Sequence, residues 1–442
     1  MRYGDVGKNP EITRLIGAAA EPLPPIGDDG FGGMFDRLAE ARIVLMGEAT
    51  HGTSEFYRAR AAITRRLVEH HGFNIVAVEA DWPDAARIDR HIRGRPIPTG
   101  DGEPPFQRFP TWMWRNREVE AFVAWLREHN ERVNDPDRKV GFYGLDLYSL
   151  GGSIRAVLDY LDRVDPEAAA EARRRYGCLT PFQEEPQGYG AAALSFGTPF
   201  CEKEVLKVLQ ELMSRRMEYL RADGEEFLDA EANARLVADA ERYYRAMYRS
   251  GYESWNLRDT HMVDTLEAVL RARGPDAKAV VWAHNSHCGD ATATEMGDMG
   301  EVNVGSLCRD RFDDAVRIIG FGTDRGIVAA ADDWDEPVQF KRIVPARSDS
   351  YEALCRDTGI PSFLLDLEKK DNSEVIDALM ERRLERAIGV IYRPETERTS
   401  HYFGAELPSQ FDHYLWFAET KAVTPLGEEP DHGPSETWPF GV

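Results

Sequence analysis

Short apolar runs alternate with longer amphipathic segments along most of this chain. Eight runs have the length of strands, and they cover residues 43–47, 74–80, 139–146, 278–284, 316–322, 363–367, 387–392 and 413–420. The early runs are continuously apolar, which is typical of strands buried on both faces of a sheet. Helical periodicity lies between the runs at 55–71, 117–131 and 153–163, and Gly72 follows the first as a C-cap signal. The pattern predicts an α/β fold with a mostly parallel central sheet flanked by helices.

Residues 166–273 have a different pattern. They are rich in Arg, Glu, Ala and Leu and predict several long helices, interrupted by a loop-rich patch at 178–198. We therefore divide the chain into a first part of the α/β core (1–165), a largely helical insertion (166–273) and the remainder of the core (274–442), with an irregular tail after residue 426. The insertion fits two roles equally well, a lid over the sheet edge or a bundle that only packs on the core.

Polar side chains gather where the apolar runs stop. Because the carboxyl ends of parallel strands meet at one edge of a sheet, where ligands bind, these side chains are predicted to lie together. Four different runs contribute to this set, which comprises Glu48, His51, Glu79, Asp81, Asp146, His284 and His287. Agreement among four strands is a much stronger signal than any one of these residues.

Each of these residues also has a structural interpretation. A carboxylate at a strand end often caps the next helix, and a lone histidine there is often structural. Glu79 differs because it lies inside an apolar run, where an ionised carboxylate is rarely left unpaired. Arg60, on the first predicted helix, is predicted either to pair with Glu79 or to stabilise an oxyanion; the structural alternative is an exposed helix arginine.

Several familiar catalytic motifs are absent from the sequence. There is no Gly-x-Ser-x-Gly elbow, no His-Glu-x-x-His pair and no Gly-x-x-x-x-Gly-Lys phosphate loop. The remaining possibility is a His and Glu cluster that activates water directly. In that arrangement His51 is the general base, nearby carboxylates orient it and stabilise the imidazolium, and no cofactor is needed.

The amino-acid composition limits the classes of binding partner and the cellular location that we expect for this protein. The 442 residues carry a net charge of −23, which disfavours nucleic acid and anionic membranes. No apolar run is long enough to span a bilayer and the N-terminal stretch has no apolar signal core, so we expect a cytoplasmic protein. The five cysteines include no Cys-x-x-Cys pair, so neither a disulfide framework nor a cysteine-rich zinc site is predicted; Cys288 is of interest because it follows a histidine motif.

Four motifs resemble the erythromycin esterase family: GEATHGTSEF at 47–56, VAVEADW at 76–82, FYGLDLYS at 142–149 and WAHNSH at 282–287. The resemblance extends over 42–287 in the family's order. It implies an α/β fold with helical additions and hydrolysis of an ester, such as the lactone of a macrolide antibiotic, without a covalent intermediate. It also implies roles for single residues: His51 as the base, His287 as its assistant, and Glu48, Arg60, Glu79 and His284 around them.

The substrate-binding candidates are less specific. Glu55 and Asp146 match recurring positions of the family, and the aromatic stretch with Phe106, Phe109, Trp112 and Trp114 could either line an apolar cleft or pack in the core.

Three functions remain open. The first is a metal-independent esterase acting on a small-molecule ester or lactone. The second is a metal-dependent hydrolase that uses His51, Glu48, Glu79, His284 and His287 as ligands, and the third is a non-enzymatic binder of haem, metal or a small amphiphile. The sequence leaves the oligomeric state open.

Overall fold

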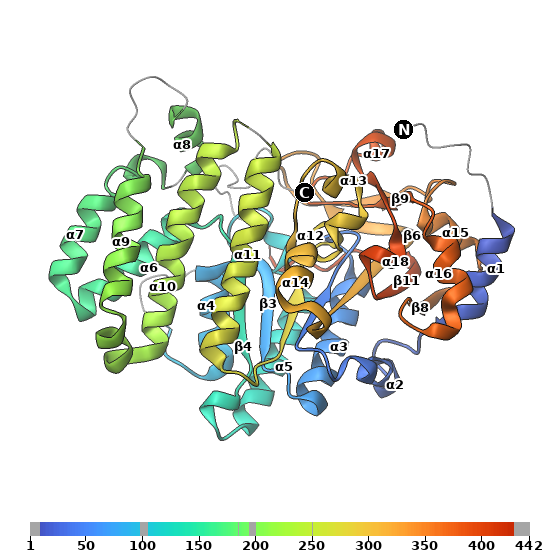
Figure 1. Cartoon of the computed structure of the whole chain (residues 1–442), viewed down its shortest axis with the longest axis horizontal. Helices are drawn as coiled ribbons and strands as arrows, with labels where there is room; N and C mark the ends of the chain where they lie inside the picture. Colours follow the sequence, from blue (N-terminus) through green and yellow to red (C-terminus); the bar gives the residue numbers. More distant parts are fainter. Residues whose placement is uncertain (1–8, 98–104, 184, 194–199, 250, 428–442) are drawn as a thin grey trace.

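A computed structural model describes residues 9–97, 105–183, 185–193, 200–249 and 251–427 (Figure 1). Its centre is a nine-stranded sheet in the order β1-β8-β11-β6-β2-β5-β3-β4, with β7 paired to β6. The predicted α/β fold with a mostly parallel sheet is confirmed, since the six neighbouring strands from β11 to β4 are all parallel. The strands span Glu21–Pro22 (β1), Ile43–Met46 (β2), Ile75–Asp81 (β3), Gly141–Asp146 (β4), Ala279–Trp282 (β5), Val316–Ala330 (β6), Gln339–Ile343 (β7), Ser362–Asp366 (β8) and His413–Thr420 (β11).

Strand β2 shows why the early apolar runs form the centre of the sheet. Ile43 and Leu45 pack into the hydrophobic cluster on one face, whereas Val44 and Met46 pack into the cluster on the other face. All four side chains are fully buried. Because successive residues of a strand point to opposite faces, only a continuously apolar sequence can satisfy both cores.

One predicted strand is wrong. Residues 387–392 form only isolated bridges at Ile388 and Ile391, and the strand there is β9 (Arg383–Arg386), paired with β10 (Tyr402–Ala405). The sequence of β9 is Arg-Leu-Glu-Arg, yet all four of its residues are buried. Arg386, for example, donates hydrogen bonds to the backbone carbonyls of Thr323 and Asp324. Hydrophobic periodicity misses such a strand because its burial depends on polar partners far away in the chain.

The predicted helices are present. The flanking helices include α3 (Ser54–His71), α4 (Trp82–Arg93), α5 (Arg117–Arg132) and α6 (Leu150–Val164). Helix α3 ends at Gly72, whose φ of 75° lies in the left-handed region that favours glycine, so the predicted C-cap is confirmed. Further helices that pack on the sheet core include α1 (Pro10–Ala19), α12 (Asn285–Cys288), α14 (Val304–Phe312), α15 (Tyr351–Asp357) and α16 (Ser373–Leu379).

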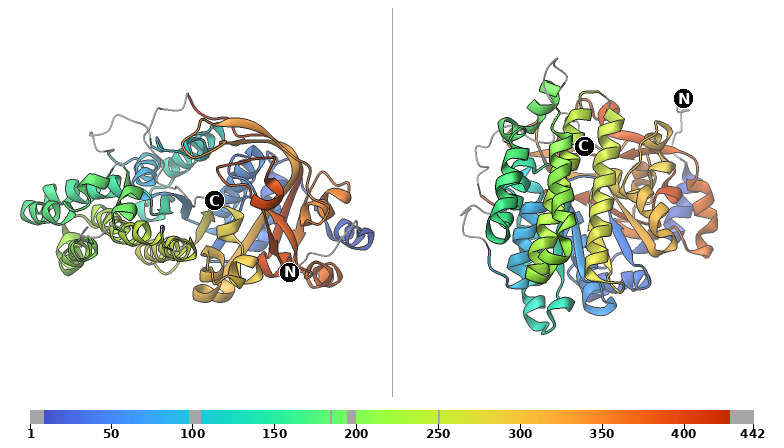
Figure 2. Two further views of the ribbon diagram at one scale, coloured as in Figure 1. Left: turned by 90° about the horizontal axis from the view of Figure 1, so that it is seen from above. Right: turned by 60° about the vertical axis from the view of Figure 1, so that its left-hand side comes forward.

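The segment 166–273 forms helices α7 (Pro166–Tyr176), α8 (Pro186–Ala193), α9 (Glu202–Ser214), α10 (Arg216–Ala246) and α11 (Gly251–Arg273). Helices α7, α8, α9 and α10 gather at one end of the molecule, whereas α11 lies nearer the middle (Figure 1 and Figure 2). Helix α11 contacts β3 and β4, and the apolar side chains of α10 and α11 belong to the same hydrophobic cluster as one face of the sheet. Helix α11 therefore brings its own polar residues close to the ends of these strands. None of the described helices is both long and apolar enough to cross a bilayer.

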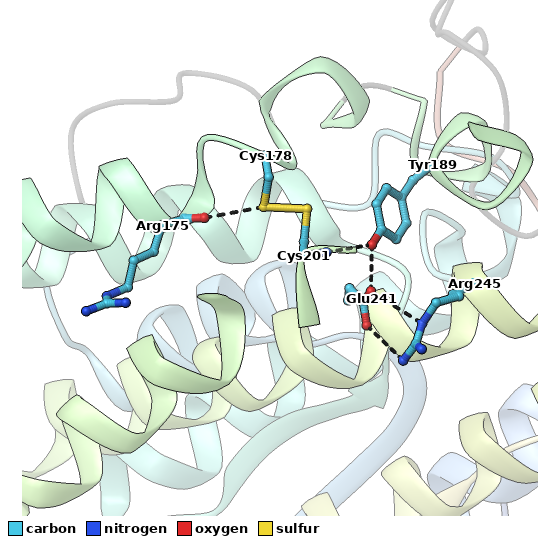
Figure 3. Close-up of a disulfide and its surroundings, with 6 residues drawn as sticks. All are labelled: Arg175, Cys178, Tyr189, Cys201, Glu241 and Arg245. Carbon is cyan, nitrogen blue, oxygen red and sulfur yellow. Dashed lines mark hydrogen bonds and ion pairs between the residues drawn. A yellow bond between two sulfur atoms is a disulfide. The ribbon is translucent and has the colours of Figure 1, made fainter. Parts of the chain in front are cut away.

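A disulfide joins Cys178 to Cys201, which the sequence analysis did not predict (Figure 3). It links the chain after α7 to the residue before α9, across 23 positions of sequence. Tyr189 of α8 donates a hydrogen bond to Glu241 of α10 and accepts one from the backbone N–H of Cys201. The pairing depends on how these helices dock, which cysteine spacing does not encode. Cys288, Cys308 and Cys355 are free and buried. The tail that we predicted to be irregular lies largely outside the described residues.

Candidate active site

The motif after β2 is shaped by two glycines at which the chain approaches other backbone or side-chain atoms closely. A Cβ atom at Gly47 would lie 2.1 Å from the side-chain oxygen of Asn285, and one at Gly52 would lie 1.9 Å from the carbonyl oxygen of Ala329. Both distances are far below van der Waals contact, so any larger residue would displace the chain. The intervening residues, including Glu48 and His51, are thereby held against the ends of the neighbouring strands.

His51, Glu48 and Arg60 form a buried chain of hydrogen bonds. Glu48 Oε1 lies 2.9 Å from His51 Nδ1, and Arg60 Nη2 donates to Glu48 Oε2 at 2.6 Å. The three side chains are between 0 and 2% exposed. A carboxylate only accepts hydrogen bonds, so Nδ1 of His51 carries a proton and Nε2 is the ring nitrogen left to accept one. This is the arrangement that a general base requires.

The structure corrects the partner that we predicted for Arg60. Its guanidinium binds Glu48 rather than Glu79, and it packs over the rings of Tyr57 and Trp282 at 4.4 and 5.0 Å. Arg60 is fully buried and does not line the cavity described below. Arg60 therefore contacts Glu48 but not the cavity.

The cation that does bind Glu79 is Arg258, near the start of α11, which the sequence analysis missed. Its Nη2 donates to Glu79 Oε1 at 2.8 Å and to Asp146 Oδ2 at 2.7 Å, and its Nε donates to Asp146 Oδ1 at 3.0 Å. The guanidinium also lies over the Tyr148 ring, 4.9 Å from the centroid. The sequence analysis searched for polar side chains at the carboxyl ends of strands, and it could not find Arg258 because this residue lies on a helix of the 166–273 segment. The available signal was indirect: two buried carboxylates at neighbouring strand ends require a cation.

His287 is held on three sides by aromatic and acidic groups. Its ring stacks on Trp255 with centroids 4.6 Å apart, Nδ1 lies 2.9 Å from both oxygens of Asp259, and Nε2 lies 3.2 Å from Glu79 Oε1. Burial alone would lower the pKa of His287, but the carboxylates of Asp259 and Glu79 raise it to about 9. His287 is therefore a cation near neutral pH. It is completely buried and does not line the cavity, so it influences His51 through Glu79.

Burial and the neighbouring charges together decide the protonation states of His284 and Glu79. Burial and the neighbouring His51 hold the pKa of His284 well below its usual value, so His284 is neutral. Burial would raise the pKa of Glu79, but His287 and Arg258 hold it well below its usual value, so Glu79 is ionised. The backbone N–H of His284 donates to Glu79 Oε2 at 2.9 Å, and the His284 ring lies 4.8 Å from that of His51. A neutral His284 does not repel an imidazolium at His51.

The raised pKa of His287 predicts a loss of stability in alkaline solution. The pKa rises from 6.5 to about 9 on folding, so the bound proton stabilises the folded state fully below pH 6.5 and this contribution is lost as the pH rises through about 9. The expected size is about 3 kcal/mol. The measurement is urea unfolding between pH 6 and 10 for the wild type and for His287→Gln. A variant that loses as much stability as the wild type over this range would contradict the assignment.

A cavity of about 80 Å³ connects these groups to solvent. His51, Glu79, Asp146 and Arg258 line it together with Asp81 and the aromatic residues Phe106, Phe109 and Trp114. It adjoins a second cavity of about 530 Å³, which shares Tyr148, Arg258 and Trp334 and is lined by further aromatic side chains. The small cavity can admit a reacting group, and the larger one can hold the rest of a bulky substrate.

The candidate substrate-binding residues divide into two pairs. Asp146 and Trp114 line the small cavity, and the indole N–H of Trp114 donates to the carbonyl oxygen of Glu79 at 3.2 Å. Trp112 is fully buried in the core, and Glu55 accepts a hydrogen bond from the backbone N–H of Lys421. Neither Trp112 nor Glu55 lines the cavity. Among the described residues, no group of three or more His, Cys, Asp or Glu side chains has the arrangement of a metal site.

Comparison with known proteins identifies a family and individual relatives that are similar to this chain in sequence. The family model described as erythromycin esterase matches residues 68–420. Erythromycin esterase type I from Escherichia coli is 23% identical over 61% of this chain and 68% of the relative. A putative hydrolase from Bacillus subtilis is 22% identical over 86% of this chain and 84% of the relative.

Solved structures share the fold. A succinoglycan biosynthesis protein aligns with a TM-score of 0.75 and 23% identity over 94% of this chain and 98% of its own. A Bacillus cereus protein aligns with a TM-score of 0.78 and 18% identity over 95% and 100%. An erythromycin esterase mutant in its open conformation aligns with a TM-score of 0.64 and 18% identity over 91% and 95%.

Proposed function

Because the chain belongs to the erythromycin esterase family, we propose that it hydrolyses a small-molecule ester or lactone with a water molecule activated by His51. The observation that carries the proposal is the His51–Glu48–Arg60 chain, which ends at a cavity lined by His51. A macrolide lactone is the first substrate to test, because two relatives are named erythromycin esterases. The proposal includes no covalent intermediate.

In the first step, water in the cavity attacks the carbonyl carbon while Nε2 of His51 accepts its proton. Glu48 stabilises the imidazolium that forms, because its Oε1 is already bonded to Nδ1. Arg60 binds the other oxygen of Glu48 and keeps it directed at His51. Arg60 is thus a positioning residue in this mechanism, and His51 is the catalytic base.

Arg258 is the group that we place at the developing oxyanion. It lines the cavity, and three of its five N–H groups donate to Asp146 and Glu79. The other two are on Nη1, which lies 3.1 Å from Nε2 of His287, so at least one remains for a carbonyl oxygen of the substrate. A fixed cation with a remaining donor stabilises negative charge as it appears in the transition state.

The experiment is hydrolysis of a panel by the purified protein, with and without a chelator. The panel contains a fourteen-membered macrolide, an ethyl ester and the p-nitrophenyl ester of the same acid. We expect at least one product to gain the mass of one water molecule, with a rate unchanged by the chelator. A rate that the chelator abolishes and a divalent metal restores would favour the metal-dependent hydrolase. Tight ligand binding without turnover on any ester would favour a binding protein.

A further inference from the structure

Asp81 occupies a helix-capping position but does not cap the helix. It ends β3 and directly precedes α4, as the N-cap residue. An aspartate there normally accepts a hydrogen bond from a backbone N–H of the first helical turn, but the Asp81 side chain makes no such bond. Instead it lines the same small cavity as His51 and Glu79. Arg108 and the backbone N–H of Ser149 hold the Asp81 carboxyl group instead, so the usual capping role of an aspartate at this position is absent.

The local backbone accounts for this orientation. The register between β3 and β4 shifts between Val78 and Asp81, which marks a bulge or irregularity in the last residues of β3. Such irregularities redirect side chains, and they are common beside active sites. Glu79 and Asp81 are two residues apart, and both line the cavity. The end of β3 thus delivers two carboxyl groups to one place.

The two carboxyl groups are in different protonation states. Burial raises the pKa of Asp81 to about 7; Arg108, bonded to it at 2.8 Å, opposes the rise, and Asp84 and Asp146 add to it. Glu79 stays ionised between His287 and Arg258. Near neutral pH a large fraction of Asp81 can therefore donate a proton, while Glu79 cannot. Of these two carboxyl groups, Asp81 is therefore the one that can act as an acid in the cavity where His51 is the proposed base.

We propose that Asp81 is the general acid that protonates the leaving oxygen of the ester. This inference rests on the proposed hydrolysis. When the tetrahedral intermediate collapses, the bond between the former carbonyl carbon and the leaving oxygen breaks, and that oxygen takes the proton of Asp81. His51 is then an imidazolium and Asp81 a carboxylate. Transfer of one proton from His51 to Asp81 through solvent restores both groups, so the reaction consumes one water molecule.

The test compares two esters of the same acid. An aliphatic alkoxide leaves poorly unless it is protonated, whereas p-nitrophenolate leaves without help. For Asp81→Asn, which is nearly isosteric, we expect kcat/KM to fall about 10²-fold for the ethyl ester. The fall for the p-nitrophenyl ester should be less than about threefold. In the wild type, kcat/KM for the ethyl ester should decline as the pH rises above about 7 and Asp81 loses its proton, and this decline should be absent from the variant.

Two further variants keep the test decisive. Asp310→Asn removes an exposed carboxyl group from α14, away from the residues that line the cavity, and it should lower both rates less than about threefold. Asp81→Glu restores the carboxyl group and should recover part of the ethyl ester rate. Equal losses for the two esters in Asp81→Asn, or no loss for the ethyl ester, would overturn the assignment. Failure of the proposed function looks different, because the wild type would then hydrolyse neither ester, and that result would overturn both proposals.

Discussion

Replacing His51 by alanine is expected to lower kcat/KM for every ester that the protein hydrolyses by about 10³-fold or more. The variant removes the ring whose Nε2 is the proposed acceptor of the proton from water. Glu48 keeps its ion pair with Arg60, so no buried charge loses its last partner. The fold should therefore be retained, with circular dichroism and melting temperature close to those of the wild type. Steady-state rates on the ethyl and p-nitrophenyl esters provide the measurement.

His70→Ala is the matched control for this prediction. His70 lies in the last turn of α3, is exposed, and is absent from the residues lining the cavity. Its removal should leave kcat/KM unchanged. Full hydrolytic activity in His51→Ala, in protein shown to be folded, would mean that another group activates the water, and the assignment of the base would have to be abandoned.

The strand ends were predictable from sequence because they follow from one geometric rule. Apolar runs at β2, β3, β4 and β5 identify parallel strands, and their carboxyl ends must share an edge. The rule placed Glu48, His51, Glu79 and Asp146 together, and the structure brings them together around one cavity or directly behind it. The direction of the strands alone was enough to predict that these side chains lie together.

The partners of these groups were not predictable in the same way. Arg60 lies on the helix that follows His51, and sequence position alone does not decide which of two nearby carboxylates it binds. Arg258 and Asp259 depend on how α11 docks against β3 and β4, which is set by packing among residues far apart in sequence. The same holds for the Cys178–Cys201 pair. Hydrophobic patterns specify where an element is buried, but they do not specify its polar contacts across the fold.

The site thus consists of two groups of charged and polar side chains that are connected through Glu79. Glu48 and His51 follow β2, and Arg60 lies on α3. Glu79 and Asp146 lie near the ends of β3 and β4, His287 lies on the short helix after β5, and Arg258 and Asp259 lie on α11. Glu79 links the two groups, because its carboxylate binds Arg258, lies beside His287 and lines the same cavity as His51. Helix α11, in the 166–273 segment, is therefore required for the electrostatics of the site.

Replacing Arg258 by methionine should have the largest effect on stability of any single change at the site. Arg258 is the cation paired with Asp146 and one of two cationic partners of Glu79, and all three side chains are at most 6% exposed. Removing one partner of a buried ion pair leaves an uncompensated charge, which costs about 3–5 kcal/mol. Urea unfolding at pH 7 measures this loss. Under conditions where the variant is folded, its kcat/KM should also fall, because the proposed donor to the oxyanion is gone.

A double variant separates the charge effect from the loss of packing. Asp146→Asn in the Arg258→Met background removes the unpaired charge but keeps a side-chain oxygen that can accept from the backbone N–H of Leu147. Because Glu79 still has His287 beside it, we expect the double variant to regain part of the stability lost by Arg258→Met. The two substitutions should therefore be strongly non-additive. Losses that simply add would show that Arg258 stabilises the site through the packing of its side chain on Tyr148 rather than through its charge.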